Sequence, residues 1–542
     1  MPIGERKTLG ELLNVLHERC SPVQNVITMN ARRRYALFLF SALGFVYYVV
    51  FWHVADLRDT AKFGGDTWEY QSMGVNFAKG HGIQRFGGLE PFSTYKFEMP
   101  SVPPPYYDYF ISGGHVTFYR TPAYPLFLGV VYKLFGVSPR IVKSLQLLML
   151  VIIAASLPFI GGHYWGRSGF IGGLLAGGLF LAINYRLAEV ILTESLTAFA
   201  VFLVLVASMA YGRRQGLLAA AALGISLGFA LLVKGTLIFL PILIVAAFLL
   251  SAIINGETGK LRRLFVMIVS MMVIVVPWCL YASIKARAPI VLATQSGFQL
   301  LSDNNEFCID GRWHPEWRDK KDSVYNTDGI ETPQYLKKVV NFYWHNPALL
   351  PPCMLAKFVA GFGPLPFLWM FTILVLLSYV HRIGNKWMKS GLLNIVWFST
   401  LLLLGLIACI VVYQVTYRGM LDRWIANASW MSKLAPVLLI GVASYLLMTE
   451  KLSFQIPRLF WLLWANFLLV TLIFHAEASV VESRFVAPVD FLFALTCCAF
   501  AVSLLSEISQ QFHSSYLLSG APRLKVRLVS ESPTASMNSP SN

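Results

Sequence analysis

The chain consists mainly of long apolar runs separated by short polar segments. The first run, Tyr35–Ala55, is long enough to cross a bilayer, which takes about 20 residues of helix. Comparable runs lie at about 142–160, 170–187, 195–211, 217–233, 236–253, 264–283, 362–380, 391–413, 434–449, 459–474 and 488–506. This pattern predicts an all-α polytopic membrane protein with about twelve transmembrane helices.

Composition agrees with this fold class. Hydrophobic residues make up 56% of the chain and charged residues 13%, whereas about a quarter of a soluble domain is charged. The net charge of +16 is high enough to raise nucleic-acid binding as an alternative. The basic residues, however, lie in short clusters between apolar runs, and no soluble basic domain is present. We therefore expect a membrane environment and no nucleic-acid partner.

The positions of the basic clusters predict the topology. Arg32, Arg33 and Arg34 precede the first apolar run, which places the N-terminus in the cytoplasm under the positive-inside rule. The loops that alternation assigns to the cytoplasm are also basic, and they contain Arg167, Arg213, Arg214, Lys260, Arg262, Arg263, Arg382, Lys386, Lys389, Lys451 and Arg458. We expect cytoplasmic termini at 1–34 and 507–542, the latter disordered, around a transmembrane domain at 35–506. The two large outward loops are then about 56–141 and 284–361.

The first outward loop contains the segment Gly64–Gly82, GGDTWEYQSMGVNFAKGHG. Its middle is compatible with a helix, in which Asp66 and Glu69 would share one face because they are three residues apart. Carboxylates near a membrane boundary are costly unless they have a function, so the pair is a candidate for chemistry. The alternative is that both only cap or solvate the segment. Later in the loop, the apolar patch Tyr124–Phe135 is too short to span and predicts a helix lying on the membrane surface.

Other ionisable residues lie near the same outer boundary. Glu194 begins a span in LTESL, where Thr193 or Ser195 could cap the helix and leave the glutamate a structural role. Lys234 lies at the break between two spans, where an extended lysine reaching the surface is the alternative. The remaining outer cations are Arg120, Lys285, Arg287, Lys357, Arg423 and Arg484. As a set, these cations suit a phosphate at the level of the lipid headgroups.

Cofactor signals are weak in this sequence. No Cys-x-x-Cys or Cys/His ligand spacing predicts structural zinc, and neither a Walker A loop nor GxGxxG is present. We expect no certain cofactor, although Asp66 and Glu194 are the residues that would hold a divalent cation. Cys308 and Cys353 fall in or beside the same outward loop, where they either pair or remain separate thiols.

Six segments in sequence order resemble the GT-C superfamily of polyprenyl-phosphate-sugar-dependent glycosyltransferases, which includes protein O-mannosyltransferases and lipid A aminoarabinose transferases. GDTWEYQSMGVNFAKGHG resembles the first outer loop of the superfamily, with Asp66, Tyr70, Gly80 and Gly82 in the matching positions. The others are YRTPAYPLFLGVVYKLFG, LTESL with LLVKGTLIFLP, VPWCLYASIKARAPIVLATQSGFQLLSDNN and ESRFVAPVDFLF. Two departures stand out. Thr67 follows Asp66 where many relatives have a glutamate, and Lys234-Gly235 replaces Arg-Pro.

The resemblance implies an inverting transfer of a hexose or pentose from a polyprenyl phosphate to a lipid, glycan or protein acceptor. The active site would face the periplasm in a cell inner membrane. Asp66 would be the general base, and Glu194 would orient a substrate. Lys234 with Arg120 or Arg484 would stabilise the departing phosphate, and Glu69, Tyr70 and Lys285 would contact substrate. The alternatives are a transporter or flippase of a lipid-linked sugar, and an oligosaccharide ligase or polymerase using a diphosphate-linked donor.

Overall fold

The structure, a computed structural model, describes residues 31–52, 61–62, 66–85, 97–98, 115–116, 118–255, 258–294, 304, 332–351, 353–354, 456–474 and 487–520. Helices dominate this part of the chain. The strands in it are two residues each: β1 (Ala61–Lys62) pairs in parallel with β3 (Phe97–Glu98), and β2 (Gln84–Arg85) pairs antiparallel with β4 (His115–Val116). These strands depart from the predicted all-α architecture, and all four lie in the first predicted outward loop.

Most of the longer helices follow the predicted apolar runs. They are α3 (Ala31–Trp52), α4 (Asp66–Ala78), α6 (Ala123–Phe135), α7 (Pro139–Asn184), η2 (Tyr185–Ala188), α8 (Glu194–Arg214), α9 (Leu217–Val233), η3 (Gly235–Ile238), α10 (Phe239–Asn255), α11 (Thr258–Ala286), α14 (Thr332–His345), η6 (Pro347–Leu349), α19 (Arg458–Phe474), η8 (Ala487–Val489) and α20 (Asp490–Gly520). The prediction for 217–233 matches α9 to the residue. The last span was expected to end near 506, but α20 continues to Gly520, so helix replaces the first part of the predicted disordered tail.

Four segments of the described chain are long and apolar enough to cross a membrane: Pro139–Ala188, Glu194–Arg214, Gly235–Ile253 and Gly259–Ala286. Shorter apolar helices include Leu217–Val233 and Asp490–Ser503. The protein is therefore a multi-pass membrane protein. The predicted spans at 362–380, 391–413 and 434–449 lie outside the described residues, so the count of about twelve remains a prediction.

The helix α7 is a hairpin whose two arms correspond to the spans predicted at 142–160 and 170–187. The backbone leaves helical geometry at Trp165 and at Gly166, where φ is 60°. The arms meet closely through glycines: a Cβ built on Gly161 would lie 2.1 Å from the carbonyl oxygen of Gly169. A Cβ on Gly173 would lie 2.5 Å from the carbonyl oxygen of Leu157. The absence of side chains at these positions lets the two backbones touch, as small residues do between membrane helices.

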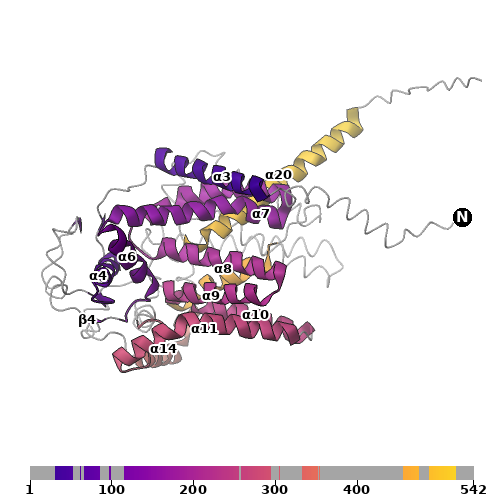
Figure 1. Cartoon of the computed structure of the whole chain (residues 1–542). Coiled ribbons are helices and arrows are strands. Elements are labelled where there is room, and N and C mark those ends of the chain that lie inside the picture. The colour runs from indigo at the N-terminus through magenta and orange to yellow at the C-terminus, as the bar shows by residue number, and fades with distance from the viewer. Residues whose placement is uncertain are drawn as a thin grey trace, which may run out of the picture.

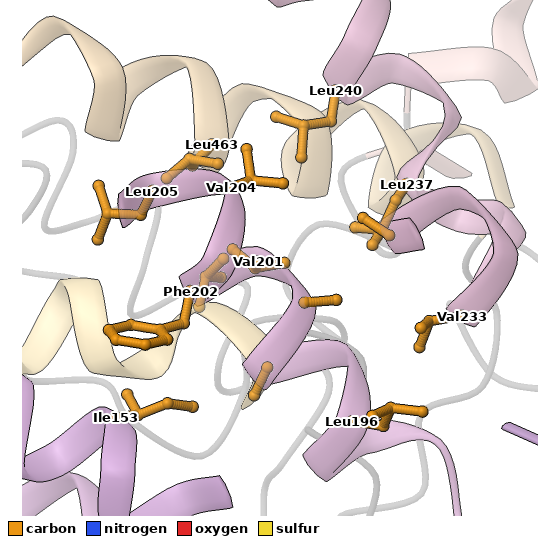
Figure 2. Close-up of a cluster of buried hydrophobic side chains, with 14 of the residues drawn as sticks. Ile153, Leu196, Val201, Phe202, Val204, Leu205, Val233, Leu237, Leu240 and Leu463 are labelled. Atoms are coloured by element: carbon orange, nitrogen blue, oxygen red, sulfur yellow. The ribbon is translucent and has the colours of Figure 1, made fainter. Parts of the chain in front are cut away.

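A buried cluster around α8 packs this helix against α7, α9, α10 and α19 (Figure 2). Its labelled members are Ile153 of α7; Leu196, Val201, Phe202, Val204 and Leu205 of α8; Val233 of α9; Leu237 and Leu240; and Leu463 of α19. Leu196 follows Glu194 by two residues and Val233 immediately precedes Lys234. The core therefore fixes the backbone beside both charged residues.

The helices α4 and α6 lie together at one end of α7, α8 and α9, while the far end of α20 lies at the opposite end (Figure 1). The helices α4 and α6 pack against each other through two glycines, Gly74 of α4 against Leu128 and Gly129 of α6 against Phe77. The helix predicted at Tyr124–Phe135 is confirmed as α6, and its exposed face includes Val130, Leu134 and Phe135. Its position on the membrane surface remains a prediction.

Candidate active site

The first turn of α4 carries both predicted carboxylates. Asp66 is the first residue of α4 and Glu69 lies one turn later, so both occupy the N-terminal end, where the helix dipole favours negative charge. The helix is followed by Gly80 and Gly82, whose φ values of +87° and +79° suit glycine at the predicted Gly-His-Gly break. The predicted placement of the two carboxylates on one face is confirmed, because both bind the same guanidinium.

That guanidinium belongs to Arg120, in the turn before α6. Its Nε donates to Glu69 Oε2 at 2.7 Å, and its Nη2 donates to Asp66 Oδ1. The Arg120 side chain is 7% exposed, whereas that of Asp66 is 35% exposed. The guanidinium carbon lies 5.2 Å from the ring centroid of Tyr70 and 5.0 Å from that of Tyr119. We call Asp66, Glu69 and Arg120 the α4 cluster.

The protonation states in this cluster follow from burial and charge. Burial alone would lower the pKa of Arg120, but Asp66 and Glu69 outweigh it and raise that pKa well above its ordinary value. Burial raises the pKa of Tyr70, and the nearby positive charge of Arg120 offsets only part of this effect. Arg120 is therefore a permanent cation and Tyr70 a neutral phenol. The proton acceptor best exposed in the cluster is Asp66.

A second ion pair joins α8 to the end of α9. Lys234 Nζ lies 3.2 Å from Glu194 Oε1, and the two side chains are 14% and 5% exposed. Lys234 is thus held by Glu194, and a small part of its side chain remains exposed. Glu194 Oε2 is buried, and no group in the described part of the chain forms a hydrogen bond with it. The carboxylate therefore retains an acceptor for a further donor.

The capping role considered for Thr193 and Ser195 is not found. Thr193 is the N-cap residue of α8, but its side chain makes no capping hydrogen bond. Ser195 Oγ instead donates to the carbonyl oxygen of Leu187 at 3.1 Å. Glu194 is consequently the acidic residue of the first turn, and its described partner is Lys234.

The α4 cluster and the Glu194–Lys234 ion pair are connected through the protein interior. Thr121 Oγ1 donates to the carbonyl oxygen of Val233 at 2.9 Å, which links the residue after Arg120 to the residue before Lys234. The charges of Asp66 and Glu194 both raise the pKa of Tyr70, so both groups lie near the same phenol.

Tyr124 and Gln146 complete this interior network, although sequence reasoning gave neither residue a role. The Tyr124 ring packs edge-on against Tyr70, with centroids 5.1 Å apart, and its hydroxyl donates to Gln146 Oε1 at 2.6 Å. Gln146 Nε2 then donates to the carbonyl oxygens of Ala188 and Val190, in the turn that leads to α8. Tyr124 lies in the segment YRTPAYPLF, and the resemblance of this segment to the GT-C superfamily is the sequence signal that could have identified it.

The other predicted site residues are less informative. Lys285 lies in the last turn of α11 and makes no ion pair with the described residues. Arg484, Lys357, Arg423 and Cys308 lie outside the described residues, so their roles and the Cys308–Cys353 pairing remain predictions. Within the described ranges, no group of three or more His, Cys, Asp or Glu side chains is arranged to hold a metal ion.

Residues 98–289 match the profile of a family described as dolichyl-phosphate-mannose-protein mannosyltransferase. The matched region contains Arg120, Glu194 and Lys234. No curated protein compared with the chain matches it.

Two solved structures are also similar: ArnT from Cupriavidus metallidurans bound to undecaprenyl phosphate, with a TM-score of 0.34, and the same protein in the apo state, with 0.35. Each is 17% identical, and the match covers 90% of this chain and 80% of the other.

Proposed function

We propose that this multi-pass membrane protein of GT-C type is an inverting glycosyltransferase that moves a sugar from a polyprenyl phosphate to an acceptor hydroxyl. The observation that carries the proposal is Asp66, a carboxylate 35% exposed at the start of α4 and held by the buried cation Arg120. An oriented carboxylate beside an acceptor hydroxyl acts as a general base, which contributes about 10²–10⁴-fold to the rate.

The reaction balances with one base and a phosphate leaving group. The acceptor oxygen attacks the anomeric carbon while its proton passes to Asp66. The bond between that carbon and the phosphate oxygen breaks, and polyprenyl phosphate leaves with both electrons. Because a cation stabilises the charge that develops on this phosphate, little acid catalysis is needed. We assign that role to Lys234, with Lys285 and Arg484 as further candidates.

The distribution of charge supports an outward-facing site. Glu194 begins α8 and Arg213 and Arg214 end it, so these arginines lie at the end of the bundle away from the α4 cluster. The turn of the α7 hairpin, with Arg167, also lies away from Asn184, which precedes the site. The positive-inside rule then assigns the basic end to the cytoplasm. This arrangement favours the proposed orientation, with cytoplasmic termini and the site on the opposite face. We propose a cell inner membrane, in which that face is periplasmic.

The donor and acceptor classes rest on the family match. The matched family is named for a mannosyl donor carried on dolichyl phosphate and for a protein acceptor. We extend only the polyprenyl-phosphate linkage to this chain and propose a lipid, glycan or protein acceptor. Transfer from a set of polyprenyl phosphates bearing different sugars will decide whether the sugar is a hexose or a pentose.

The test is transfer by the purified protein in proteoliposomes supplied with polyprenyl phosphates bearing mannose, glucose or aminoarabinose. We expect native protein to release polyprenyl phosphate from at least one donor, and Asp66→Asn to lower kcat by about 100-fold or more. Glu189→Gln is the matched control, because it removes an outer carboxylate outside both ion-paired groups. Translocation of intact donor without release of polyprenyl phosphate would favour the flippase alternative and contradict the proposal.

A further inference from the structure

The environment of Arg120 is unlike that of a phosphate ligand. Its side chain is 7% exposed, its Nε and Nη2 are occupied by Glu69 and Asp66, and its plane lies near two tyrosine rings. The α4 cluster contains two carboxylates and one guanidinium, which leaves one net negative charge. A phosphate brought to this cluster would meet repulsion from both carboxylates.

We propose that Arg120 is a positioning residue that orients Asp66 for proton transfer and does not bind the donor phosphate. This inference rests on the proposed function, and it reassigns a cation that the sequence had placed among the phosphate ligands. Asp66 remains the residue that contacts the acceptor, since it is the most exposed member of the cluster.

The fork of the guanidinium explains why an arginine stands here. Its donors are fixed in one plane, so Glu69 on Nε sets the angle at which Nη2 meets Asp66. The spacing of Asp66 and Glu69 on α4 matches this fork because residues three apart on a helix are neighbours. A lysine ammonium is a point charge without this planar geometry, and it would hold Asp66 less firmly.

Neighbouring groups restrict the arginine further. The rings of Tyr70 and Tyr119 lie within cation–π distance of the guanidinium carbon. The next residue, Thr121, is fixed to the carbonyl oxygen of Val233. The backbone and the plane of Arg120 are thus both constrained, which transmits a defined orientation to Asp66.

The experiment separates orientation from phosphate binding by measuring kcat for transfer and the Kd for a donor analogue, a non-hydrolysable polyprenyl phosphonate sugar. We expect Arg120→Gln to lower kcat on the order of 100-fold, as loss of orientation does, while the analogue Kd changes less than about threefold. Arg120→Lys restores only part of kcat. Lys234→Met, which alters the proposed phosphate ligand, should instead weaken analogue binding.

Two further variants guard against misfolding of Arg120→Gln. Glu69→Gln leaves the guanidinium in place but weakens its anchor, and we expect a lower kcat with unchanged analogue binding. In Asp66→Asn, adding Arg120→Gln should cause no further loss of kcat, because the residue it orients is gone.

Weaker analogue binding by tenfold or more in Arg120→Gln, or an unchanged kcat in Glu69→Gln, would overturn the positioning role while leaving the proposed function intact. Absence of transfer by native protein with every donor would overturn the proposed function, and this inference with it.

Discussion

Thr121 Oγ1 donates a hydrogen bond to the carbonyl oxygen of Val233 at 2.9 Å, across a sequence separation of 112 residues. Val233 is the last residue of α9, and a carbonyl at the C-terminal end of a helix has no partner within the helix. Thr121 satisfies this carbonyl and at the same time joins the α4 cluster to the Glu194–Lys234 pair. This hydroxyl therefore contributes to the relative position of the two charged groups, together with the Tyr124–Gln146 network.

Replacing Thr121 by valine should destabilise the protein and reduce transfer. The buried carbonyl of Val233 would lose its donor, which costs about 1–3 kcal/mol and would lower the Tm in detergent micelles. Thr197→Val is the matched control, because Thr197 Oγ1 donates to the Thr193 carbonyl, which also accepts from the Thr197 backbone N–H. Equal losses of Tm and of transfer rate in the two variants would show that the Thr121 bond has no special role.

Breaking the Glu194–Lys234 pair from one side should cost more than removing both charges. Both side chains are mostly buried, so Lys234→Met leaves a buried carboxylate without its described partner, at a cost of about 3–5 kcal/mol. Glu194→Gln should destabilise similarly by leaving the ammonium. We expect the double variant to unfold at a higher temperature than either single variant, and thermal unfolding of all four proteins measures this coupling. Additive losses would contradict it.

The sequence predicted the local features of the site better than its contacts. The spacing of Asp66 and Glu69 was enough to place them on one helical face, because that depends only on helix geometry. Their common partner, Arg120, lies 54 residues from Asp66 and 51 from Glu69, so no local pattern identifies it. A cation near a membrane boundary was therefore interpreted as a phosphate ligand.

Hydropathy predicted the positions of the membrane helices well but their ends less well. The runs at 142–160 and 170–187 correspond to the arms of α7, but their close packing depends on glycines facing each other across the hairpin. The span predicted at about 488–506 agrees with the apolar part of α20, Asp490–Ser503, and the polar residues after 506 end the span without ending the helix. Helix continues to Gly520, just before Pro522.

Alanine at Gly161 should disrupt the α7 hairpin. Its Cβ would lie 2.1 Å from the carbonyl oxygen of Gly169, which belongs to the backbone and cannot rotate away. Overpacking of this kind costs about 1–3 kcal/mol and would lower the Tm in micelles. Gly178→Ala is the matched control, because its nearest atom is 4.0 Å away, on Phe45. A Tm for Gly161→Ala equal to that of the control would show that the arms separate readily.

Alkaline pH should destabilise the native protein more than it destabilises the Tyr70→Phe variant. Burial raises the pKa of Tyr70, while an unfolded tyrosine has its ordinary value of about 10. The stabilisation from this neutral phenol is fully present below about pH 10 and is lost at higher pH, where the unfolded state releases the proton first. Native Tm should therefore fall more steeply than the variant's between about pH 10 and pH 12, measured by thermal unfolding in micelles. The quantity compared is the slope of Tm against pH within each protein, so the packing cost of losing the hydroxyl cancels. Parallel slopes in the two proteins would show that Tyr70 ionises freely in the folded protein.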